Sequence, residues 1–456
     1  MDKPPVLLDK TKEELVDIIL KQDQQIKDLQ EKLKSLESKQ KQKELPKFIK
    51  ANIRKHHHKP GQKTGHEGTG RLLPKQVDEI IDQILQACPH CHNELNKAAE
   101  VIEHTQEDII PARVKVTKYR RHRYWCRHCQ TIIEAPYHET EIPHGKIGPN
   151  VLIHAAILKY NHCLPYGKIA ELFKELAGLE ITAGALAQSL QTLSHWLKVE
   201  QQTILSAIRA GPYVHIDETG WRLDGKSHWL WAFVNKKLAY YRIEPSRGRK
   251  IVKDTLTDTY GGTIISDFYG IYFRLPYKKQ KCLVHLLREL YNTAKHDDSA
   301  QYRRYYKQIK RIVDDAVRLK ESKPHLIPAV FQRRFKRIKR RLFMLIGGTG
   351  STNKNIRRLS KRFSKFWLDM LTFLEIDNID WNNNLAERLI RPHVIYRNRS
   401  FGNRSPQGVK AHEIVTSIIQ SLRLQKRSVF ESLKTAFLAH RHGETKPLLF
   451  TNCSGN

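Results

Sequence analysis

The sequence predicts an α/β core in which three antiparallel strands precede alternating helices and strands. From Gly211 onward, polar and apolar residues alternate, which indicates strands over 212–223, 227–235 and 238–245. Asp224 and Gly225 supply a tight hairpin turn between the first two of these strands. A helix over 249–260, a fourth strand over 262–268 and a short fifth strand leading into a helix over 281–295 follow. This order is that of a ribonuclease-H-like α/β core.

Length and charge indicate a chain of several units that binds a polyanion. A chain of 456 residues is too long for one ordinary core, so about two to four units are expected. The formal net charge is +33, and an excess of this size favours nucleic acid as the partner. No run approaches the roughly 18 apolar residues of a spanning helix, and the N-terminus lacks an apolar signal core. We therefore expect a cytoplasmic protein without a membrane partner, associated with the nucleoid when it is bound to DNA.

The predicted core is interrupted by a basic helical insertion. The first part of the core spans 210–296, the insertion 297–375 and the last part of the core 376–440, before a tail over 441–456. The insertion contains repeated Lys and Arg runs with few acids nearby. Because such runs are more than a solvated surface needs, we expect the insertion to contact the DNA backbone.

A helical region over 146–209 precedes the core. One helix ends at a glycine, and Thr182 is placed to cap the next helix. Two short helices around a Gly-containing turn are typical of a helix-turn-helix DNA-binding region. Ordinary helical packing is the alternative.

A heptad pattern lies near the N-terminus, within residues 9–45. Spacings of four and three residues predict a leucine-zipper-like coiled-coil helix, which would join copies of the chain into a homo-oligomer. A single amphipathic helix on the protein's own surface is the alternative. The basic, Gly-rich segment 46–74 has too little apolar surface to order itself and is predicted to be a flexible linker that contacts phosphates. The pattern consists of Leu15, Ile19, Gln22, Ile26, Leu29, Leu33 and Leu36.

Two CxxC pairs within residues 75–145 predict a small zinc-binding domain. Each pair brings two thiolates within reach of one tetrahedral ion, so two pairs complete a closed structural site. The odd number of cysteines, seven, fits a reducing compartment better than a disulfide framework. The intervening segment 101–125 is expected to form a strand pair. The predicted zinc ligands are Cys88, Cys91, Cys126 and Cys129.

Three carboxylates are candidates for a catalytic metal site. Asp217 ends one apolar strand and Asp267 ends another, so both can converge on one pocket. Glu218 should face away from Asp217, because side chains alternate along a strand. Glu387 lies on a later helix, which Pro392 is expected to stop. Three carboxylates suit two Mg²⁺ ions, which prefer hard oxygen ligands and assist in-line displacement at phosphate; structural carboxylates are the alternative.

Residues around Glu387 are candidates for DNA contact. Asn383, Glu387 and Arg391 recur every four residues and should line one helix face, which would carry an amide to orient the carboxylate and a cation for phosphate. The basic stretch that follows is expected to grip phosphates, with a solvated tail as the alternative. The predicted DNA-binding residues are Asn383, Arg388, Arg391, Arg397, Arg399 and Arg404.

These motifs together resemble those of the IS66 family of insertion-sequence transposases. Besides the zipper-like helix and the CxxC pairs, the resemblance rests on five segments. Phe268 stands where the family has glycine, which puts the local turn in doubt more than the chemistry. The segments are KPGQKTGHEG, HIDETGWRLDGKSHWLW, SDFYGIY, CLVHLLREL with Cys282, His285 and Arg288, and NNNLAERLIRPHVIYRNRSFGNRS.

The resemblance implies a function for the chain. It implies a bacterial DNA transposase that binds terminal inverted repeats and target DNA, works with accessory proteins of the same element, and cleaves and transfers strands. It also implies that Asp217, Asp267 and Glu387 form an Asp-Asp-Glu triad dependent on Mg²⁺, for which Mn²⁺ can substitute. A catalytically inactive end-binding or regulatory protein, or a ribonuclease-H-like nuclease without joining activity, are the alternatives. For Cys282 and His285 a structural role is favoured over a second metal site or a nucleophile.

Overall fold

A computed structural model describes residues 22, 24–26, 28–30, 76–87, 89–95, 100–347 and 350–451. The chain divides into two compact units, residues 1–108 and 109–456, which are treated separately. Of the predicted zipper, the described positions between 22 and 30 are helical, with Ile26 and Leu29 exposed. The rest of that helix and the whole linker 46–74 lie outside the described residues. No helix in the described ranges combines the length and apolar character of a membrane span.

The second unit contains a short β-hairpin that carries one CxxC pair. Strands β1 (Arg123–Cys126) and β2 (Thr131–Glu134) pair antiparallel, with Cys126 opposite Thr131. The strand pair predicted within 101–125 is wrong, because β1 is the one strand that forms in this segment. Apolar side chains such as Ile102 and Val116 are 87% and 89% exposed, so no packed face favours a longer strand pair.

Four helices precede the sheet: α2 (Pro149–Tyr160), α3 (Tyr166–Ala177), α4 (Ala183–Trp196) and α5 (Lys198–Ala210). The predicted cap is confirmed, because the Thr182 hydroxyl accepts a hydrogen bond from the amide of Ala185 at 3.1 Å. Helix α4 contacts α2, α3 and α13, and it buries Leu186, Leu190 and Leu193. This packing makes α4 part of a helical layer with α2, α3 and α13.

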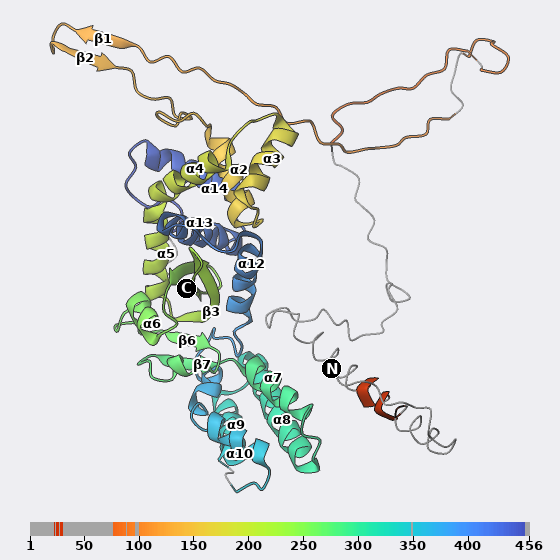
Figure 1. The fold of residues 1–456 in the computed structure, drawn as a ribbon, viewed down its shortest axis with the longest axis vertical. Coiled ribbons are helices and arrows are strands. Elements are labelled where there is room, and N and C mark those ends of the chain that lie inside the picture. The colour runs from red at the N-terminus through yellow and green to blue at the C-terminus, as the bar shows by residue number, and fades with distance from the viewer. Residues whose placement is uncertain are drawn as a thin grey trace, which may run out of the picture. The chain divides into compact units, whose positions relative to one another are not determined.

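The core of the second unit is a five-stranded sheet with strand order β5-β4-β3-β6-β7. Its strands β3, β6 and β7 are labelled in Figure 1. Strands β3 (Tyr213–Leu223), β4 (Lys226–Val234) and β5 (Ala239–Glu244) are antiparallel, as predicted. The hairpin turn is also confirmed, since Asp224 and Gly225 both have positive φ, 49° and 73°. Helix α6 (Arg249–Leu256) leads to β6 (Thr263–Ser266), and β7 (Lys278–Lys281) follows; β6 and β7 run parallel to β3.

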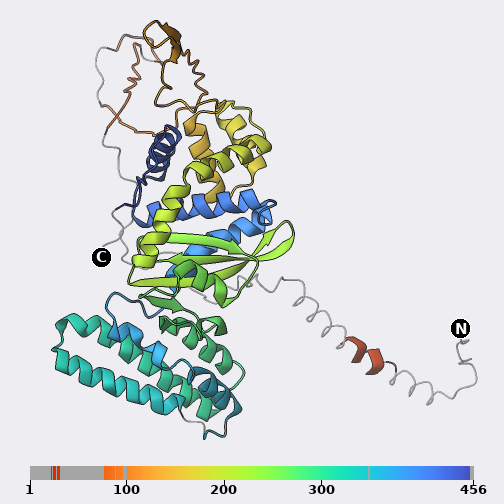
Figure 2. The same cartoon turned by 90° about the vertical axis from the view of Figure 1, so that its left-hand side faces the viewer.

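Side chains of a helix occupy the β5 edge of the sheet. Helix α13 (Pro406–Leu424) runs along this edge, and in Figure 2 the green strands lie between the blue α13 and the teal insertion. Three β5 amides that would otherwise lack a partner therefore bond to side chains of α13. They are Ala239 to Ser421 Oγ at 2.9 Å, Tyr241 to Ser417 Oγ at 3.0 Å and Ile243 to Glu413 Oε1 at 2.6 Å.

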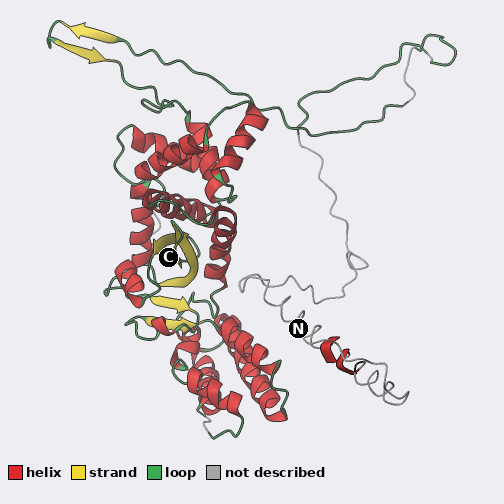
Figure 3. Cartoon of the chain, in the orientation of Figure 1, coloured by secondary structure: helices red, strands yellow, loops and turns green. Residues whose placement is uncertain are grey.

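The predicted insertion is helical, and its apolar side chains form one core together with α7 (Leu283–Ala294) and the end of β6. The insertion follows α7 and consists of α8 (Ala300–Ser322), η3 (Lys323–His325), α9 (Pro328–Ile346), α10 (Lys354–Phe363), η4 (Leu368–Met370) and α11 (Thr372–Glu375), drawn as red helices in Figure 3. Its last elements close the β7 edge, where Thr372 Oγ1 donates to the carbonyl of Lys279 at 2.7 Å and Gln280 Oε1 accepts from the amide of Phe373 at 2.8 Å.

The chain returns to the sheet through α12 (Asn384–Ser400) and ends with α13 and α14 (Val429–Arg441). The prediction that Pro392 stops this helix is wrong, because Pro392 lies inside α12. Tertiary packing compensates for the missing amide. Two turns of α12 around Pro392 bury His393 and Tyr396 against the sheet, where Tyr396 stacks on Trp221 with ring centroids 5.6 Å apart.

Candidate active site

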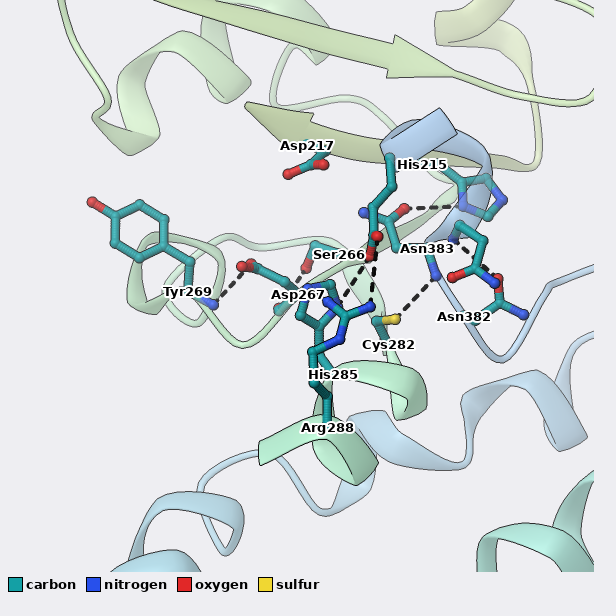
Figure 4. A network of polar contacts seen from close by, with 12 residues as sticks. His215, Asp217, Ser266, Asp267, Tyr269, Cys282, His285, Arg288, Asn382 and Asn383 are labelled. Carbon is teal, nitrogen blue, oxygen red and sulfur yellow. Dashed lines mark hydrogen bonds and ion pairs between the residues drawn. The ribbon is translucent and has the colours of Figure 1, made fainter. Parts of the chain in front are cut away.

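Two of the predicted carboxylates lie on adjacent parallel strands. Asp217 is in β3 and Asp267 directly follows β6 (Figure 4). The β3–β6 register pairs His215 with Ile265, so its continuation by two residues brings Asp217 beside Asp267 on the same face. Asp217 Oδ1 accepts from the amide of Glu218, and Asp267 Oδ1 accepts from the amide of Tyr269, both at 2.9 Å. Each carboxylate is thereby fixed by its own backbone.

The third carboxylate, Glu387, approaches from the first turn of α12. Its Oε1 lies 3.5 Å from Nδ1 of His285, and its Oε2 lies 3.9 Å from Nη2 of Arg288. His285 and Arg288 belong to α7, so this carboxylate lies between α12 and α7, the helix that precedes the insertion. Neither Glu387 Oε1 nor His285 Nδ1 has a hydrogen-bond partner in the described part of the chain.

The three carboxylates are close enough for their charges to interact. Burial raises the pKa of Asp217 well above its ordinary value, and the negative charges of Glu218, Asp267 and Glu387 raise it further. Asp217 and Asp267 therefore lie side by side, and Glu387 lies near enough for its charge to act on Asp217, although oxygens of the three carboxylates do not all lie within 4.8 Å of one another. A concentration of acid groups of this kind is unfavourable without a cation.

Glu218, which the sequence analysis placed away from Asp217, has partners of its own. Its Oε1 forms an ion pair with Arg247 at 2.7 Å, and its Oε2 accepts from the Tyr272 hydroxyl at 2.6 Å. Arg247 in turn lies over the ring of Tyr269, 4.0 Å from its centroid. These contacts anchor the loop after β6 to β3, so Glu218 positions the segment that carries Asp267.

Asn383 ties the helix that carries Glu387 to the sheet. It is fully buried, donates to the carbonyl of Ile216 at 2.9 Å and faces Nδ1 of His215 at 3.1 Å. The backbone amide of Asn383 also donates to Cys282 Sγ at 3.2 Å. The prediction that Asn383 binds DNA is therefore wrong, because its polar atoms are used inside the protein and no DNA can reach them.

Lys281, a buried cation behind the acidic cluster, was not among the predicted site residues. Its Nζ donates to the carbonyl oxygen of Asp267 at 2.9 Å and to Ser266 Oγ at 3.1 Å. Burial lowers the pKa of Lys281 to about 8, although the charge of Asp267 opposes this effect. Its position in the polar strand KKQK gives no indication of burial, since the rings of Tyr272 and Phe366 that cover it come from distant segments.

A cleft of about 490 Å³ opens beside Asp267 and leads toward the insertion. Arg288 of α7 and Arg358 and Arg362 of α10 line it, together with amide and imidazole groups. Glu289 balances part of this charge, with Oε1 3.4 Å from Arg358 and 2.8 Å from Arg362. The cleft thus joins a carboxylate cluster to a row of guanidinium groups suited to phosphate.

The other predicted DNA-binding residues lie on α12 and the segment after it. Arg388, Arg391, Arg399 and Arg404 are exposed. Arg397 is partly buried, bonds to the carbonyl of Gly220 and lies 3.4 Å from Thr219 Oγ1, so it links α12 to β3 close to Asp217. The guanidinium of Arg397 is therefore partly engaged within the protein.

The predicted zinc ligands fall in both units of the chain. Cys126 and Cys129 flank the β1–β2 turn, where the amide of Cys129 donates to Cys126 Sγ at 3.5 Å. Backbone hydrogen bonds from Cys129 and His128 lower the pKa of the Cys126 thiol, which favours the thiolate that binds metal. Cys91 lies exposed in the first unit, and Cys88 lies outside the described residues.

Carboxylates on adjacent strands of a sheet beside an arginine-lined cleft are typical of proteins that act on nucleic acid. The model of the Transposase IS66 family matches residues 144–411, which include the sheet, the insertion and all three carboxylates. The chain belongs to this family. A second model, the zinc-finger binding domain of transposase IS66, matches residues 86–130 and spans all four predicted zinc ligands. The matches support a transposase role, and the second indicates zinc binding and contact with DNA.

The chain is also similar to three proteins of Sinorhizobium fredii. It is 24% identical to the uncharacterized protein y4jD over 77% of this chain and 75% of that protein. It is 25% identical to the uncharacterized protein y4qI over 70% and 64% of the two chains, and 23% identical to the uncharacterized protein y4hP over 76% and 69%.

Proposed function

We propose that this transposase cleaves and joins DNA strands through an Asp-Asp-Glu triad of Asp217, Asp267 and Glu387 on a ribonuclease-H-like core. The observation that carries the proposal is the approach of these three carboxylates to one another. Asp217 and Asp267 lie side by side on β3 and after β6, and the charges of Asp267 and Glu387 add to the effect of burial in raising the pKa of Asp217. The strand order, with β6 and β7 parallel to β3, supports the assignment of the core.

The acidic cluster fits a pair of Mg²⁺ ions. All three side chains offer hard oxygen ligands; Asp217 is partly buried, and Glu387 Oε1 has no hydrogen-bond partner among the described residues. When bound, the ions would activate the attacking water or 3′-hydroxyl and stabilise the leaving oxygen, and Mn²⁺ can substitute. The protein's part is to hold the carboxylates in place: backbone amides fix both aspartates, and Asn383 fixes the start of α12.

The cleft beside Asp267 gives the DNA strand a path to these carboxylates. Arg288, Arg358 and Arg362 would pair with phosphates next to the scissile bond, and the basic outer faces of α8 and α9 would hold the flanking duplex. Arg388, Arg391, Arg399 and Arg404, with Arg397 near β3, would extend the contact along α12. Recognition of terminal inverted repeats and target DNA is assigned to these surfaces.

Other parts of the chain have supporting roles in this proposal. Cys88, Cys91, Cys126 and Cys129 would hold one structural Zn²⁺, which would position the N-terminal region or DNA. The zipper-like helix would join copies of the chain, and accessory proteins of the same element would act with it. The helices over 146–209 would contribute to DNA binding.

Conservative substitution of each carboxylate tests the proposal. Asp217→Asn, Asp267→Asn and Glu387→Gln should each abolish Mg²⁺-dependent cleavage of DNA that carries the element's ends, while end binding stays nearly intact. Glu244→Gln, an equally conservative change on β5, should cleave like the parent protein. Cleavage retained in any triad variant would refute that residue's assignment.

Two further outcomes separate the alternatives. If the unaltered protein binds ends but never cleaves in Mg²⁺ or Mn²⁺, the chain is an end-binding or regulatory protein. If it cleaves but a labelled 3′-end is never joined to target DNA, it is a nuclease without joining activity.

A further inference from the structure

We propose that Cys282, His285 and Glu387 form a binding site for a thiophilic divalent cation such as Zn²⁺, and that a cation bound there competes with Mg²⁺ for Glu387. The first half of this proposal concerns only the three side chains. The second half rests on the catalytic role proposed for Glu387.

The three side chains have the ligand types and spacing of a soft-metal site. The Cys282 sulfur, one ring nitrogen of His285 and one Glu387 oxygen all lie within 4.8 Å of one another. Two ligands of a tetrahedral zinc ion, each about 2.0–2.1 Å from the metal, are about 3.4 Å apart. His285 Nδ1 and Glu387 Oε1 are 3.5 Å apart, so these two atoms already have the separation that one ion requires.

Two of the three ligand atoms lack another partner. His285 Nδ1 and Glu387 Oε1 are both shielded from solvent, and neither makes a hydrogen bond among the described residues. Burying a polar atom without a partner is costly, so this pair favours a ligand that contacts both atoms. A cation would satisfy both atoms at once.

The local backbone prepares Cys282 to bind metal as a thiolate. It is the N-terminal cap of α7, and its sulfur accepts the amide of Asn383 at 3.2 Å. Burial raises the pKa of the Cys282 thiol, and the backbone amides at the helix N-terminus, which favour a negative sulfur, offset this effect only in part. On metal binding the thiol proton leaves to solvent, and the cation compensates for the burial of the thiolate.

Arg288 regulates access to this site. Its Nη2 lies 3.9 Å from Glu387 Oε2, and its Nη1 lies 3.5 Å from His285 Nε2. In the absence of metal, the guanidinium therefore partly neutralises Glu387. When Nδ1 coordinates a cation, the ring proton is on Nε2, so Arg288 must release the imidazole and become free to bind phosphate.

The position of the site predicts its effect on catalysis. Glu387 is the one residue common to this cluster and to the proposed Mg²⁺ site. The Asp217 and Asp267 ligands suit Mg²⁺, whereas sulfur and imidazole select zinc-like ions. Zn²⁺ held by Cys282 and His285 would therefore occupy Glu387 and inhibit cleavage in the presence of Mg²⁺.

Cobalt binding to the full chain tests the site without any need for activity. Co²⁺ bound to thiolate absorbs light, and the CxxC cysteines contribute equally in every variant. Cys282→Ser should lose about one bound Co²⁺ per chain relative to the parent protein, with part of the thiolate-to-cobalt absorption. Cys163→Ser removes another buried cysteine and should bind like the parent protein.

A second variant keeps the test decisive if Cys282→Ser does not fold. His285→Ala changes a partly exposed side chain and should also lose about one Co²⁺ per chain, since three protein ligands hold the ion. Equal Co²⁺ stoichiometry in the parent protein, Cys282→Ser and His285→Ala would overturn the proposed site.

Zn²⁺ titration of the cleavage reaction tests the competition. In Mg²⁺, micromolar Zn²⁺ should inhibit the parent protein and Cys163→Ser, whereas Cys282→Ser should be resistant relative to its own rate without Zn²⁺. Equal inhibition of all three would overturn the competition. A protein that binds the extra Co²⁺ but never cleaves would leave the metal site standing and refute the proposed function instead.

Discussion

The ammonium group of Lys281 donates to the main-chain carbonyl of Asp267 at 2.9 Å, and the carboxylate of Asp267 accepts from the amide of Tyr269 at 2.9 Å. Asp267 is thus held through its backbone as well as through its side chain. Because the same ammonium also donates to Ser266, the end of β6 and the end of β7 are connected beneath the acidic cluster.

Removal of the Lys281 charge should loosen this support. Lys281→Met keeps the length of the side chain but leaves the Asp267 carbonyl and the Ser266 hydroxyl without a donor, which should lower the free energy of unfolding by about 1–3 kcal/mol. Urea denaturation measures this loss. Lys278→Met, at an exposed position of the same strand, should have little effect. An equally stable Lys281→Met protein would show that the ammonium is not needed to hold Asp267.

Two buried histidines should make the protein sensitive to acid. His393 Nδ1 lies 3.0 Å from His412 Nε2 between α12 and α13. Burial lowers the pKa of His393 to about 3 and lowers the pKa of His412 well below its ordinary value. The unfolded chain therefore takes up protons on both histidines below a pH of about 6.5, whereas in the folded chain His393 takes up its proton only near a pH of about 3 and His412 only well below its ordinary range.

The contribution of the two histidines to the free energy of unfolding should therefore be fully present above neutral pH, and it should be lost as the pH decreases through this window. When the pH falls from 7 to 5, each histidine should lower the free energy of unfolding by about 2 kcal/mol, as measured by denaturation at both pH values. The double variant His393→Gln/His412→Gln should lose less stability over the same interval, whatever its stability at pH 7. His228→Gln, at a partly exposed position, is the matched control. A pH dependence that the double variant retains in full would assign the effect to other groups.

The arginines of the cleft should contribute to the salt dependence of DNA binding. Arg358→Ala/Arg362→Ala should weaken binding of end-bearing DNA and reduce the slope of log affinity against log salt by about one to two, because each phosphate contact releases counterions. Arg249→Ala/Lys250→Ala removes the same charge from exposed positions on α6, outside this cleft, and should leave the slope nearly unchanged. Equal slopes for both double variants would place the DNA elsewhere.

The serines of α13 should stabilise the edge of the sheet. Ser417→Ala/Ser421→Ala leaves the amides of Ala239 and Tyr241 buried without acceptors, which should cost about 1–3 kcal/mol each. Thermal or urea unfolding measures the loss. Ser432→Ala on α14 changes a partly exposed serine and should cost far less. If the double variant is as stable as the parent protein, water must replace the serine hydroxyls as acceptors for these amides.

Much of the core could be predicted because its signals are local. Alternating residues identified β3, β4 and β5, and two aspartates at the ends of apolar strands indicated the neighbours Asp217 and Asp267. The errors arose where distant segments decide the outcome. Pro392 is accommodated because α12 packs on the sheet, and Asn383 is buried because β3 offers it a carbonyl. Lys281 is covered by Phe366, which belongs to the insertion and is distant from Lys281 in the sequence. The approach of Cys282 to Glu387 depends on the same long-range folding.

The contact of α13 with β5 also limits how copies of this chain can associate. An unpaired strand invites a second polypeptide to add its own strand, but here any such addition would first have to displace a helix whose serine and glutamate side chains already take the hydrogen bonds. The opposite border is similarly closed by η4 and α11. Higher-order complexes on DNA would therefore use surfaces other than the two edges of this five-stranded sheet, so that assembly would not alter the geometry of the strands that carry Asp217 and Asp267.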